Sequence, residues 1–195
     1  MLDPLGIFIF VTKLLNPKYL LHTMFWLTVI SALYFFLPAY LANMFPSLAK
    51  NLPFLQYPVW EKKLGKNKTW RGVLIATLTG GLIFWLQQLA YAKGFTAWAV
   101  IDYSGFSIAL GFLMGFGAIF GDLVESYYKR KAGIIPGKPW IPFDQLDFVI
   151  GGLVLSFFVY VPKASIILII LLASPLLHIL FNRIGYWLKL QKNKL

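Results

Sequence analysis

Cysteine is absent from this 195-residue sequence, and charged residues are scarce. Without cysteine the chain can form neither a disulfide framework nor a thiolate metal site. Only 13% of its residues are charged, against roughly 25% in a typical soluble domain, while 59% are hydrophobic. The aromatic content of 18% is also far above that of disordered chains. These values exclude an ordinary water-soluble domain and favour an integral membrane protein.

Acidic residues are the rarest charged type, with seven Asp and Glu against 18 Lys and Arg. The resulting net charge of +11 would suggest nucleic-acid binding in a soluble protein. The anionic surface of a membrane attracts the same charge, and it also orients membrane proteins. We therefore expect the lipid bilayer, and no nucleic acid, as the partner of this basic chain.

The uncharged stretches of the chain have the length of membrane-spanning helices. A helix needs about 20 apolar residues to cross the hydrocarbon core. The stretches show no alternating polarity of the kind that a barrel strand requires. They contain 31, 21, 19, 15 and 19 residues, and lie between the charged positions 18 and 50, 71 and 93, 102 and 122, 147 and 163, and 163 and 183. The fold class is predicted as an all-α integral membrane protein with five transmembrane helices at about 20–42, 72–92, 104–127, 146–162 and 165–187.

The distribution of Lys and Arg predicts how these helices are oriented. Fourteen of them fall in the first and third connections between these helices, that is loops 43–71 and 128–145, and in the C-terminal turn and tail. Only four fall on the other side. Because basic loops stay in the cytoplasm, we expect the N-terminus outside and an active site that faces the cytoplasm from the cytoplasmic (inner) membrane. Residues 1–195 then form a single polytopic membrane domain.

The N-terminal segment from Leu5 to Leu15 is apolar but too short to cross a bilayer. It lacks the basic start and the small-residue cleavage site of a signal peptide, and Asp3-Pro4 precedes it. We interpret it as an uncleaved interfacial or re-entrant segment.

Four of the seven acidic residues form two pairs at the ends of predicted helices. Asp122 and Glu125 end the third helix, and Asp144 and Asp147 open the fourth. The spacing of three places both carboxylates of a pair on one helix face. Carboxylates near hydrocarbon are costly and usually functional, and together they would suit Mg²⁺ with a phosphate substrate. The alternative for Asp144 and Asp147 is that they cap the fourth helix.

Two basic segments lie next to these acidic residues and predict phosphate binding. In the first loop, residues 65–72 place three cations, an amide and a hydroxyl before a helix N-terminus, an arrangement that suits a phosphate. The glycine spacing of a P-loop is missing. In the second segment, Lys129 and Arg130 precede a stretch with glycines and prolines at 133–142, which can wrap an anionic ligand; the alternative for this segment is an ordinary basic cytoplasmic loop. The candidate substrate-binding residues are Lys66, Asn67, Lys68, Thr69, Arg71, Ser126 and Lys138, and Lys129 and Arg130 are candidate catalytic residues.

Several other residues are predicted to have structural roles. His22 and His178 lie in different membrane segments, without other metal-ligating residues near them in sequence, and we expect interfacial or packing roles for both. Three glycines of the third helix, at 111, 115 and 117, predict close helix packing. Pro38 and Pro175 are expected to kink their helices.

The stretch from Gly121 to Gly152, with its Asp-Gln-Leu-Asp-Phe run at 144–148, resembles the CTP-dependent lipid cytidylyltransferases, most closely the CDP-archaeol synthases. The run at 68–72 is similar to that family's first-loop motif. The resemblance implies a membrane enzyme that joins CMP from CTP to a lipid phosphate, releases pyrophosphate and uses Mg²⁺. It implies metal roles for Asp144 and Asp147, with Asp122 as a further ligand. It also implies phosphate contacts by Lys68, Arg71, Lys129 and Arg130, supported by Asn67, Thr69 and Ser126.

The segment from Gly133 to Pro142 departs from the diacylglycerol branch of these enzymes, which has a Lys-Asp pair and a His-Gly-Gly run there. This moves the resemblance towards the archaeal branch, in which Glu125 is less expected. The expected acceptor is therefore an unsaturated archaeal ether-lipid phosphate, di-O-geranylgeranylglyceryl phosphate. Phosphatidate or another lipid phosphate is the alternative with the same chemistry. A small ion transporter is the alternative of a different class, but it predicts acidic residues near the bilayer midplane.

Overall fold

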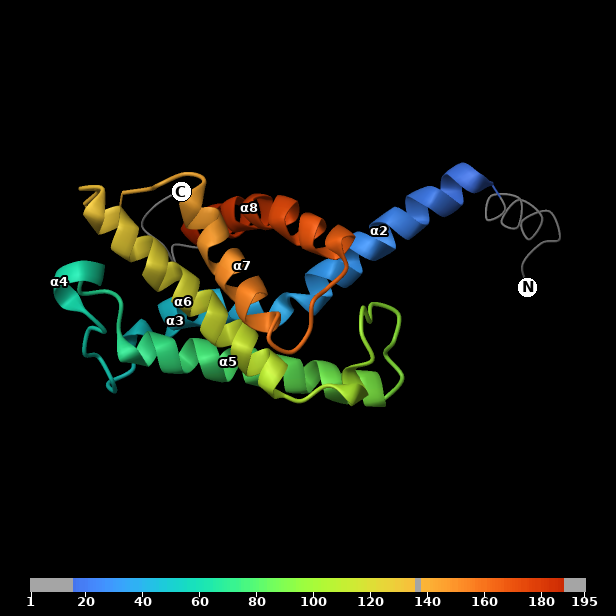
Figure 1. Ribbon diagram of the computed structural model, residues 1–195, viewed down its shortest axis with the longest axis horizontal. Coiled ribbons are helices and arrows are strands. Elements are labelled where there is room, and N and C mark those ends of the chain that lie inside the picture. Colours follow the sequence, from blue (N-terminus) through green and yellow to red (C-terminus); the bar gives the residue numbers. More distant parts are fainter. Residues whose placement is uncertain (1–15, 136–137, 188–195) are drawn as a thin grey trace.

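The computed structural model describes residues 16–135 and 138–187, which form a bundle of α-helices (Figure 1). The predicted N-terminal segment 5–15, residues 136 and 137 of the second basic loop, and the lysines of the C-terminal tail lie outside the described residues. Within the described ranges the only strand-like pairing is an isolated bridge between Pro58 and Thr69. The elements are α2 (Pro17–Phe35), α3 (Leu37–Leu48), η1 (Ala49–Asn51), α4 (Glu61–Leu64), α5 (Trp70–Ala92), η2 (Tyr103–Gly105), α6 (Ala109–Lys131), α7 (Phe143–Ser156) and α8 (Ala164–Trp187).

Helices α5 and α6 are long and apolar enough to cross a membrane. Helices α2 and α3 provide a third crossing if the bent pair is one broken span. Helix α7 has 14 residues, and the apolar part of α8, Ala164–Leu180, is shorter than 18 residues. The predicted all-helical fold is thus confirmed for the described residues, with two or three segments long and apolar enough to span a membrane, whereas the number of five spans stays a prediction.

The first predicted helix, 20–42, is two helices that meet at Phe36 with a bend of 49°. Pro38 has no backbone N–H, so the carbonyl of Tyr34 loses its helical partner. The side chain of Gln87 on α5 donates a hydrogen bond to this carbonyl. The predicted kink at Pro38 is therefore confirmed, and a polar side chain from a neighbouring helix satisfies the freed carbonyl.

Two predicted boundaries differ from the observed helices. The third helix starts at Ala109 rather than near 104, because Asp102 accepts hydrogen bonds from the backbone N and the hydroxyl of Ser104 and caps the short helix η2. The fourth helix runs from Phe143 to Ser156 rather than from 146 to 162, and a turn follows it at 157–159. An uncharged stretch sets the length of apolar chain but not the residue at which a turn interrupts it.

Helix α6 lies between α5 and α7, and glycines allow all three backbones to approach closely (Figure 1). A Cβ added at Gly115 would lie 2.5 Å from the carbonyl oxygen of Ala76 on α5. A Cβ at Gly117 would lie 2.4 Å from the carbonyl oxygen of Gly151 on α7. Since real Cβ atoms do not come this close, only glycine fits at these positions. The predicted close packing of the third helix is confirmed.

Candidate functional site

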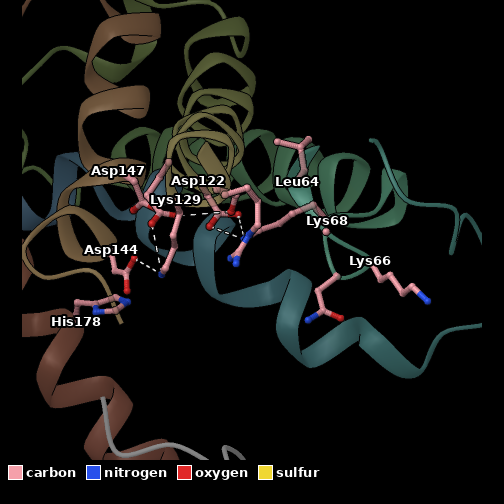
Figure 2. Close-up of a pocket in the computed structure, with 13 residues that line it drawn as sticks. Leu64, Lys66, Lys68, Asp122, Lys129, Asp144, Asp147 and His178 are labelled. Carbon is pink, nitrogen blue, oxygen red and sulfur yellow. Dashed lines mark hydrogen bonds and ion pairs between the residues drawn. The ribbon is translucent and has the colours of Figure 1, made fainter. Parts of the chain in front are cut away.

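A polar cavity of about 320 Å³ lies where α6 and α7 meet the segment before α5 (Figure 2). This volume is within the range of small-molecule sites, roughly 300 to 1,000 Å³. Four acidic and four basic side chains contribute to its wall. The lining residues are Leu64, Gly65, Lys66, Asn67, Lys68, Asp122, Glu125, Ser126, Lys129, Arg130, Asp144, Asp147 and His178.

The close crossing of α6 and α7 brings the two acidic pairs together. A Cβ added at Gly121 would lie 2.0 Å from the carbonyl oxygen of Asp147, so the two backbones almost touch at this point. As a result Asp122, Glu125 and Asp147 each offer a carboxylate oxygen, and these three oxygens lie within 4.8 Å of one another. The i, i+3 spacing on α6 turns Asp122 and Glu125 towards α7, as the sequence predicts.

These three carboxylates fit a hard divalent cation. Oxygen is the ligand that such cations prefer, and Mg²⁺ usually binds a few carboxylates and completes its shell with water and phosphate oxygens. The side chain of Glu125 is only 8% exposed, and Lys129 at 3.4 Å is a cationic neighbour that offsets part of the cost of burying its charge. Glu125, which the family resemblance made less expected, is therefore part of the acidic cluster.

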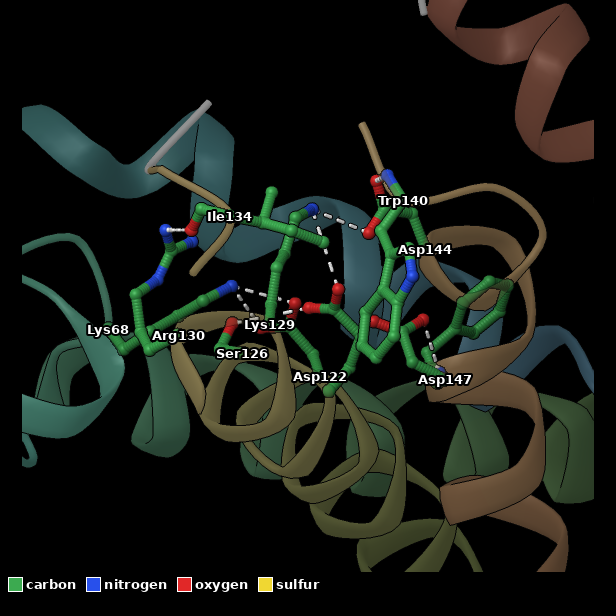
Figure 3. Close-up of polar contacts among 11 residues, drawn as sticks. Lys68, Asp122, Ser126, Lys129, Arg130, Ile134, Trp140, Asp144 and Asp147 are labelled. Atoms are coloured by element: carbon green, nitrogen blue, oxygen red, sulfur yellow. Dashed lines mark hydrogen bonds and ion pairs between the residues drawn. The ribbon is translucent and has the colours of Figure 1, made fainter. Parts of the chain in front are cut away.

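Asp144 makes different contacts from the other three acidic residues. Its Oδ1 lies 2.6 Å from Nζ of Lys129, and its Oδ2 accepts a hydrogen bond of 2.7 Å from the backbone N of Trp140 (Figure 3). Lys129 also forms an ion pair of 3.4 Å with Glu125, one helical turn away. Lys129 thus links the first turn of α7 to α6, and it is itself only 8% exposed. Breaking a buried pair of this kind typically costs about 3–5 kcal/mol.

Lys68 provides the second cation beside the acidic cluster. Its Nζ lies 2.7 Å from both carboxylate oxygens of Asp122 (Figure 3). Burial by itself would lower the pKa of Lys68, but the carboxylate of Asp122, with smaller contributions from Asp147 and Glu125, raises that pKa above its ordinary value. Lys68 is therefore a permanently charged group in the cavity at neutral pH.

The fold of the first loop explains why Lys68 faces the cavity and Arg71 does not. The loop folds back on the start of α5, with backbone hydrogen bonds from Val59 to Lys68 and from Trp70 to Tyr57. Thr69 caps α5 by accepting a hydrogen bond of 3.3 Å from the backbone N of Gly72.

Arg71 lies in the first turn of α5, and its Nη1 donates to the carbonyl oxygen of Leu52 at 2.5 Å. It is only 8% exposed and does not line the cavity. Of the predicted substrate-binding residues, Thr69 and the exposed Lys138 do not line it either. Their predicted phosphate contacts stay predictions.

The short helix α4 carries the loop over the cavity. Lys63 lies 5.0 Å from the ring centre of Trp60 and 5.5 Å from that of Tyr127 on α6, which is within the distance of cation–π contacts. These contacts connect α4 to α6 and place the following residues, Gly65 to Lys68, at the cavity. Lys66, Asn67 and Lys68 therefore line it, and their predicted substrate binding stays a prediction.

An apolar groove of about 450 Å³ adjoins the polar cavity, between the outer faces of α6 and α7. Glu125 and Asp147 line both, so the acidic cluster is the boundary between them. The sides of the groove are aromatic and aliphatic, and the rings of Trp140 and Phe143 pack at a tilt with their centres 4.5 Å apart. The groove is lined by Phe120, Gly121, Val124, Glu125, Tyr128, Trp140, Pro142, Phe143, Leu146, Asp147, Ile150, Gly151, Val154 and Leu155.

The sequence predicts His178 to be a packing residue, and the structure shows that it also lines the polar cavity. Its ring packs on Phe148 at a centroid distance of 6.3 Å, and it also lines the polar cavity. Its separation from the acidic residues, 31 residues beyond Asp147 in sequence, hides this proximity. Only the packing of α8 against α7 brings them together.

Comparisons with known proteins identify the family of the chain. The family model described as CarS-like, CDP-archaeol synthase, matches residues 24–194. A CDP-archaeol synthase of Thermococcus kodakarensis is 36% identical over 174 residues, which cover 85% of this chain and 93% of that protein. A CDP-archaeol synthase of Methanospirillum hungatei is 34% identical over 166 residues, which cover 80% of this chain and 98% of that protein.

A solved structure is similar as well. It is described as "Structural insight into an intramembrane enzyme for archaeal membrane lipids biosynthesis", with a TM-score of 0.60 and 29% sequence identity. The match covers 77% of this chain and 92% of that one. The resemblance predicted from the two sequence motifs is thus confirmed, and the chain belongs to the CarS-like CDP-archaeol synthase family.

Proposed function

We propose that this protein transfers CMP from CTP to di-O-geranylgeranylglyceryl phosphate, giving CDP-archaeol and pyrophosphate. One observation carries the proposal: a cavity with clustered carboxylates and cations shares Glu125 and Asp147 with an apolar groove. A nucleotide with its metal ion and a lipid phosphate can therefore meet at the same carboxylates. Membership of the family, whose relatives carry the name CDP-archaeol synthase, supports this choice of substrates.

The reaction is a nucleophilic substitution at phosphorus. An oxygen of the lipid phosphate attacks the α-phosphorus of CTP, the bond from that phosphorus to the bridging oxygen breaks, and pyrophosphate leaves with the electron pair. The attacking phosphate is already ionised at pH 7, so the protein needs no strong general base. Two anions must meet, and charge neutralisation is therefore the main requirement.

We assign the residues to this requirement by their positions. Asp122, Glu125 and Asp147 would hold Mg²⁺, which screens the phosphates and stabilises the leaving pyrophosphate. Lys68 and Arg130 line the same cavity and bind phosphate oxygens. Lys66, Asn67 and Ser126 are polar supports on the cavity wall.

Lys129 also faces the cavity, and Asp144 holds its ammonium group at 2.6 Å. We propose that this contact orients Lys129 towards the reacting phosphates. Metal binding by Asp144 is a second role for the same carboxylate, and it requires the contact with Lys129 to lengthen. The two roles differ in their response to Asp144→Glu, which keeps the charge but moves it by one methylene.

The apolar groove suits the isoprenoid chains of the acceptor. Its lining is almost entirely hydrophobic, and it begins at the two carboxylates that it shares with the polar cavity. The lipid chains can stay among apolar side chains while the phosphate reaches the metal ion. Pairing a polar and an apolar compartment in this way avoids the desolvation of the lipid phosphate in hydrocarbon.

We further propose the arrangement in the membrane that the charge pattern predicts. Five spans in a single polytopic domain place the N-terminus outside and loops 43–71 and 128–145 in the cytoplasm. The cytoplasmic face of the inner membrane is where CTP is available. The bent α2–α3 pair, α5, α6, α7 and α8 would be the five spans, with α7 crossing less than the full bilayer thickness because it has 14 residues.

Purified protein in detergent or liposomes, incubated with labelled CTP, Mg²⁺ and lipid phosphates, tests the proposal. We expect a CDP-lipid and pyrophosphate in equal amounts from the unsaturated archaeal acceptor, and none after chelation with EDTA. Restoring Mg²⁺ should restore the product. If no lipid phosphate gives a CDP-lipid, the enzyme function is wrong. If phosphatidate reacts and the archaeal acceptor does not, the acceptor is wrong and the chemistry stands.

A further inference from the structure

Among the described residues, His178 is the one from α8 that lines the polar cavity; the other lining residues come from the first loop, α6 and α7. In Figure 2 its ring lies beside Asp144, whereas Lys66 lies at the opposite end of the same cavity. The imidazole therefore lies at the end of the cavity away from Lys66, next to the pair formed by Asp144 and Lys129.

The packing of α8 fixes this position. Ser174 lies one turn before His178, is fully buried, and its hydroxyl is 2.7 Å from the phenol oxygen of Tyr40 on α3. Phe148 of α7 packs against both the Tyr40 ring and the His178 ring. The opposite face of α8, with Leu172 at 73% and Leu176 at 70% exposure, faces away from the bundle. α8 thus has a polar side that faces the cavity.

Three directions lead away from the acidic cluster, and each has its own chemistry. The first loop brings lysines, which suit the phosphates that leave as pyrophosphate. The groove between α6 and α7 is apolar and suits the lipid. The third direction ends at His178, whose ring nitrogens can donate and accept hydrogen bonds and whose face can stack on a flat ring. A lipid chain offers nothing to such a group, whereas the ribose hydroxyls and the polar edge of the pyrimidine in a nucleoside can hydrogen-bond to a ring nitrogen.

We propose that His178 binds the nucleoside half of CTP, through a hydrogen bond to a ribose hydroxyl or to the polar edge of the pyrimidine. The proposal rests on the function proposed above and names a substrate contact that the sequence analysis did not predict. His178 takes no part in the bond changes at phosphorus. Its contact sets the affinity and the choice of nucleotide, and it leaves the lipid site unchanged.

The test compares His178→Phe with His178→Gln. Phenylalanine keeps an aromatic ring on Phe148 but removes both ring nitrogens, while glutamine keeps a donor and an acceptor. The loss of one net hydrogen bond, about 0.5–1.5 kcal/mol, corresponds to a roughly 2- to 12-fold change. We expect His178→Phe to raise the KM for CTP and the Kd for CTP with Mg²⁺ by this factor, with the KM for the lipid phosphate unchanged. His178→Gln should lie closer to the wild type.

Two nucleotide analogues separate the two possible contacts. If His178 binds the ribose 2′-hydroxyl, dCTP binds the wild type more weakly than CTP, and His178→Phe removes that difference. If His178 binds the base, the same is expected with UTP in place of dCTP. His22→Phe is the matched control, because His22 lies exposed on α2 and accepts a hydrogen bond from Trp26 within the same helix.

Binding of CTP is measured by calorimetry as well as by turnover, so that the two proposals can fail separately. A wild type that binds CTP but makes no CDP-lipid refutes the proposed function. Weaker CTP binding by His178→Phe would still support the contact in that case. Wild-type CTP affinity in His178→Phe, with its preference among CTP, dCTP and UTP unchanged, refutes the contact. A change confined to the KM for the lipid phosphate refutes it too.

Discussion

The contact between α6 and α7 predicts that one added methyl group inactivates the protein. In Gly121→Ala, the new Cβ would lie 2.0 Å from the carbonyl oxygen of Asp147, whereas ordinary contacts begin at 3.4 Å. The helices must therefore separate locally by about 1.4 Å, the difference between these two distances. Overpacking of this kind typically costs about 1–3 kcal/mol of stability, which a helix bundle of this size can tolerate.

The same separation is far more serious for the acidic cluster. Asp122 and Glu125 move with α6, and Asp147 moves with α7. Their three oxygens now lie within 4.8 Å, and two oxygens bound to one Mg²⁺ lie no more than about 4.2 Å apart. In the native protein a small side-chain rearrangement brings the oxygens from 4.8 Å to this distance. In Gly121→Ala the helices lie about 1.4 Å further apart, and a rearrangement of the same size no longer brings the oxygens together. A misplacement of about 1 Å can cost roughly 100-fold in rate, and we expect at least this loss in kcat/KM.

The assay measures CDP-lipid formation over a series of Mg²⁺ concentrations, together with thermal unfolding. Gly121→Ala should require more Mg²⁺ and remain slow at saturation. Gly105→Ala is the control, because a Cβ at Gly105 meets nothing within 4 Å and its backbone has no glycine-specific conformation. Near-normal activity and Mg²⁺ dependence in Gly121→Ala would show that the helix crossing does not set the carboxylate geometry.

Five other substitutions test individual residues. Asp144→Asn or Asp147→Asn should abolish turnover while the size-exclusion profile stays that of the folded protein, and Asp144→Asn should also lower the unfolding temperature because Lys129 loses a charged partner; near-normal rates would remove the residue from the metal or phosphate site. Lys129→Met leaves the carboxylates of Glu125 and Asp144 without their cation. It should lower the unfolding temperature, and it should lower the rate by at least tenfold. Arg71→Ala should lower the unfolding temperature and leave the KM for CTP within about twofold, whereas a phosphate contact would require a larger rise. The raised pKa of Lys68 means that its ion pair stabilises the fold fully below its ordinary pKa and is lost only as pH rises through the higher folded value. The difference in unfolding temperature between the wild type and Lys68→Met should therefore be constant from about pH 7 to 9 and shrink only above about pH 10.4.

Charge scarcity made the class of this protein predictable. A sequence with few charged residues reveals its membrane segments through the gaps between them, and those gaps located α5 closely and α6 to within about five residues at either end. The pairing of acidic residues by three also predicted correctly which faces of α6 and α7 carry carboxylates. Both signals depend only on the periodicity of a helix, which the sequence contains.

Helical periodicity does not predict which acidic residues of α6 and α7 come into contact. That contact depends on where two helices cross, and the crossing is set by glycines whose partners lie on the other helix. The sequence ranked Glu125 below Asp144 as a metal ligand, but the contact at Gly121 brings Glu125 to Asp147. Asp144 instead pairs with Lys129.

Lys68 and Arg71 show the same limit within one motif. The two cations are three residues apart and look equivalent in sequence. The cap at Thr69 separates them, because Lys68 precedes the helix and reaches Asp122, while Arg71 lies in the first turn and points to Leu52. His178 was not predicted in the cavity at all, since the packing of α8 rather than any local pattern places it there.

The charge of the cavity bears on how nucleotide and metal would bind. Its lining carries four carboxylates and four cations, so its formal charge is zero when all are ionised. Such a cavity has little net attraction for the tetra-anion of free CTP, and the acidic cluster repels the phosphates at short range. A divalent cation beside Asp122, Glu125 and Asp147 changes this balance, because it makes the cavity positive and offers the phosphates a ligand. Binding of each then favours binding of the other, and by reciprocity CTP must raise the affinity for Mg²⁺ by the same factor as Mg²⁺ raises the affinity for CTP.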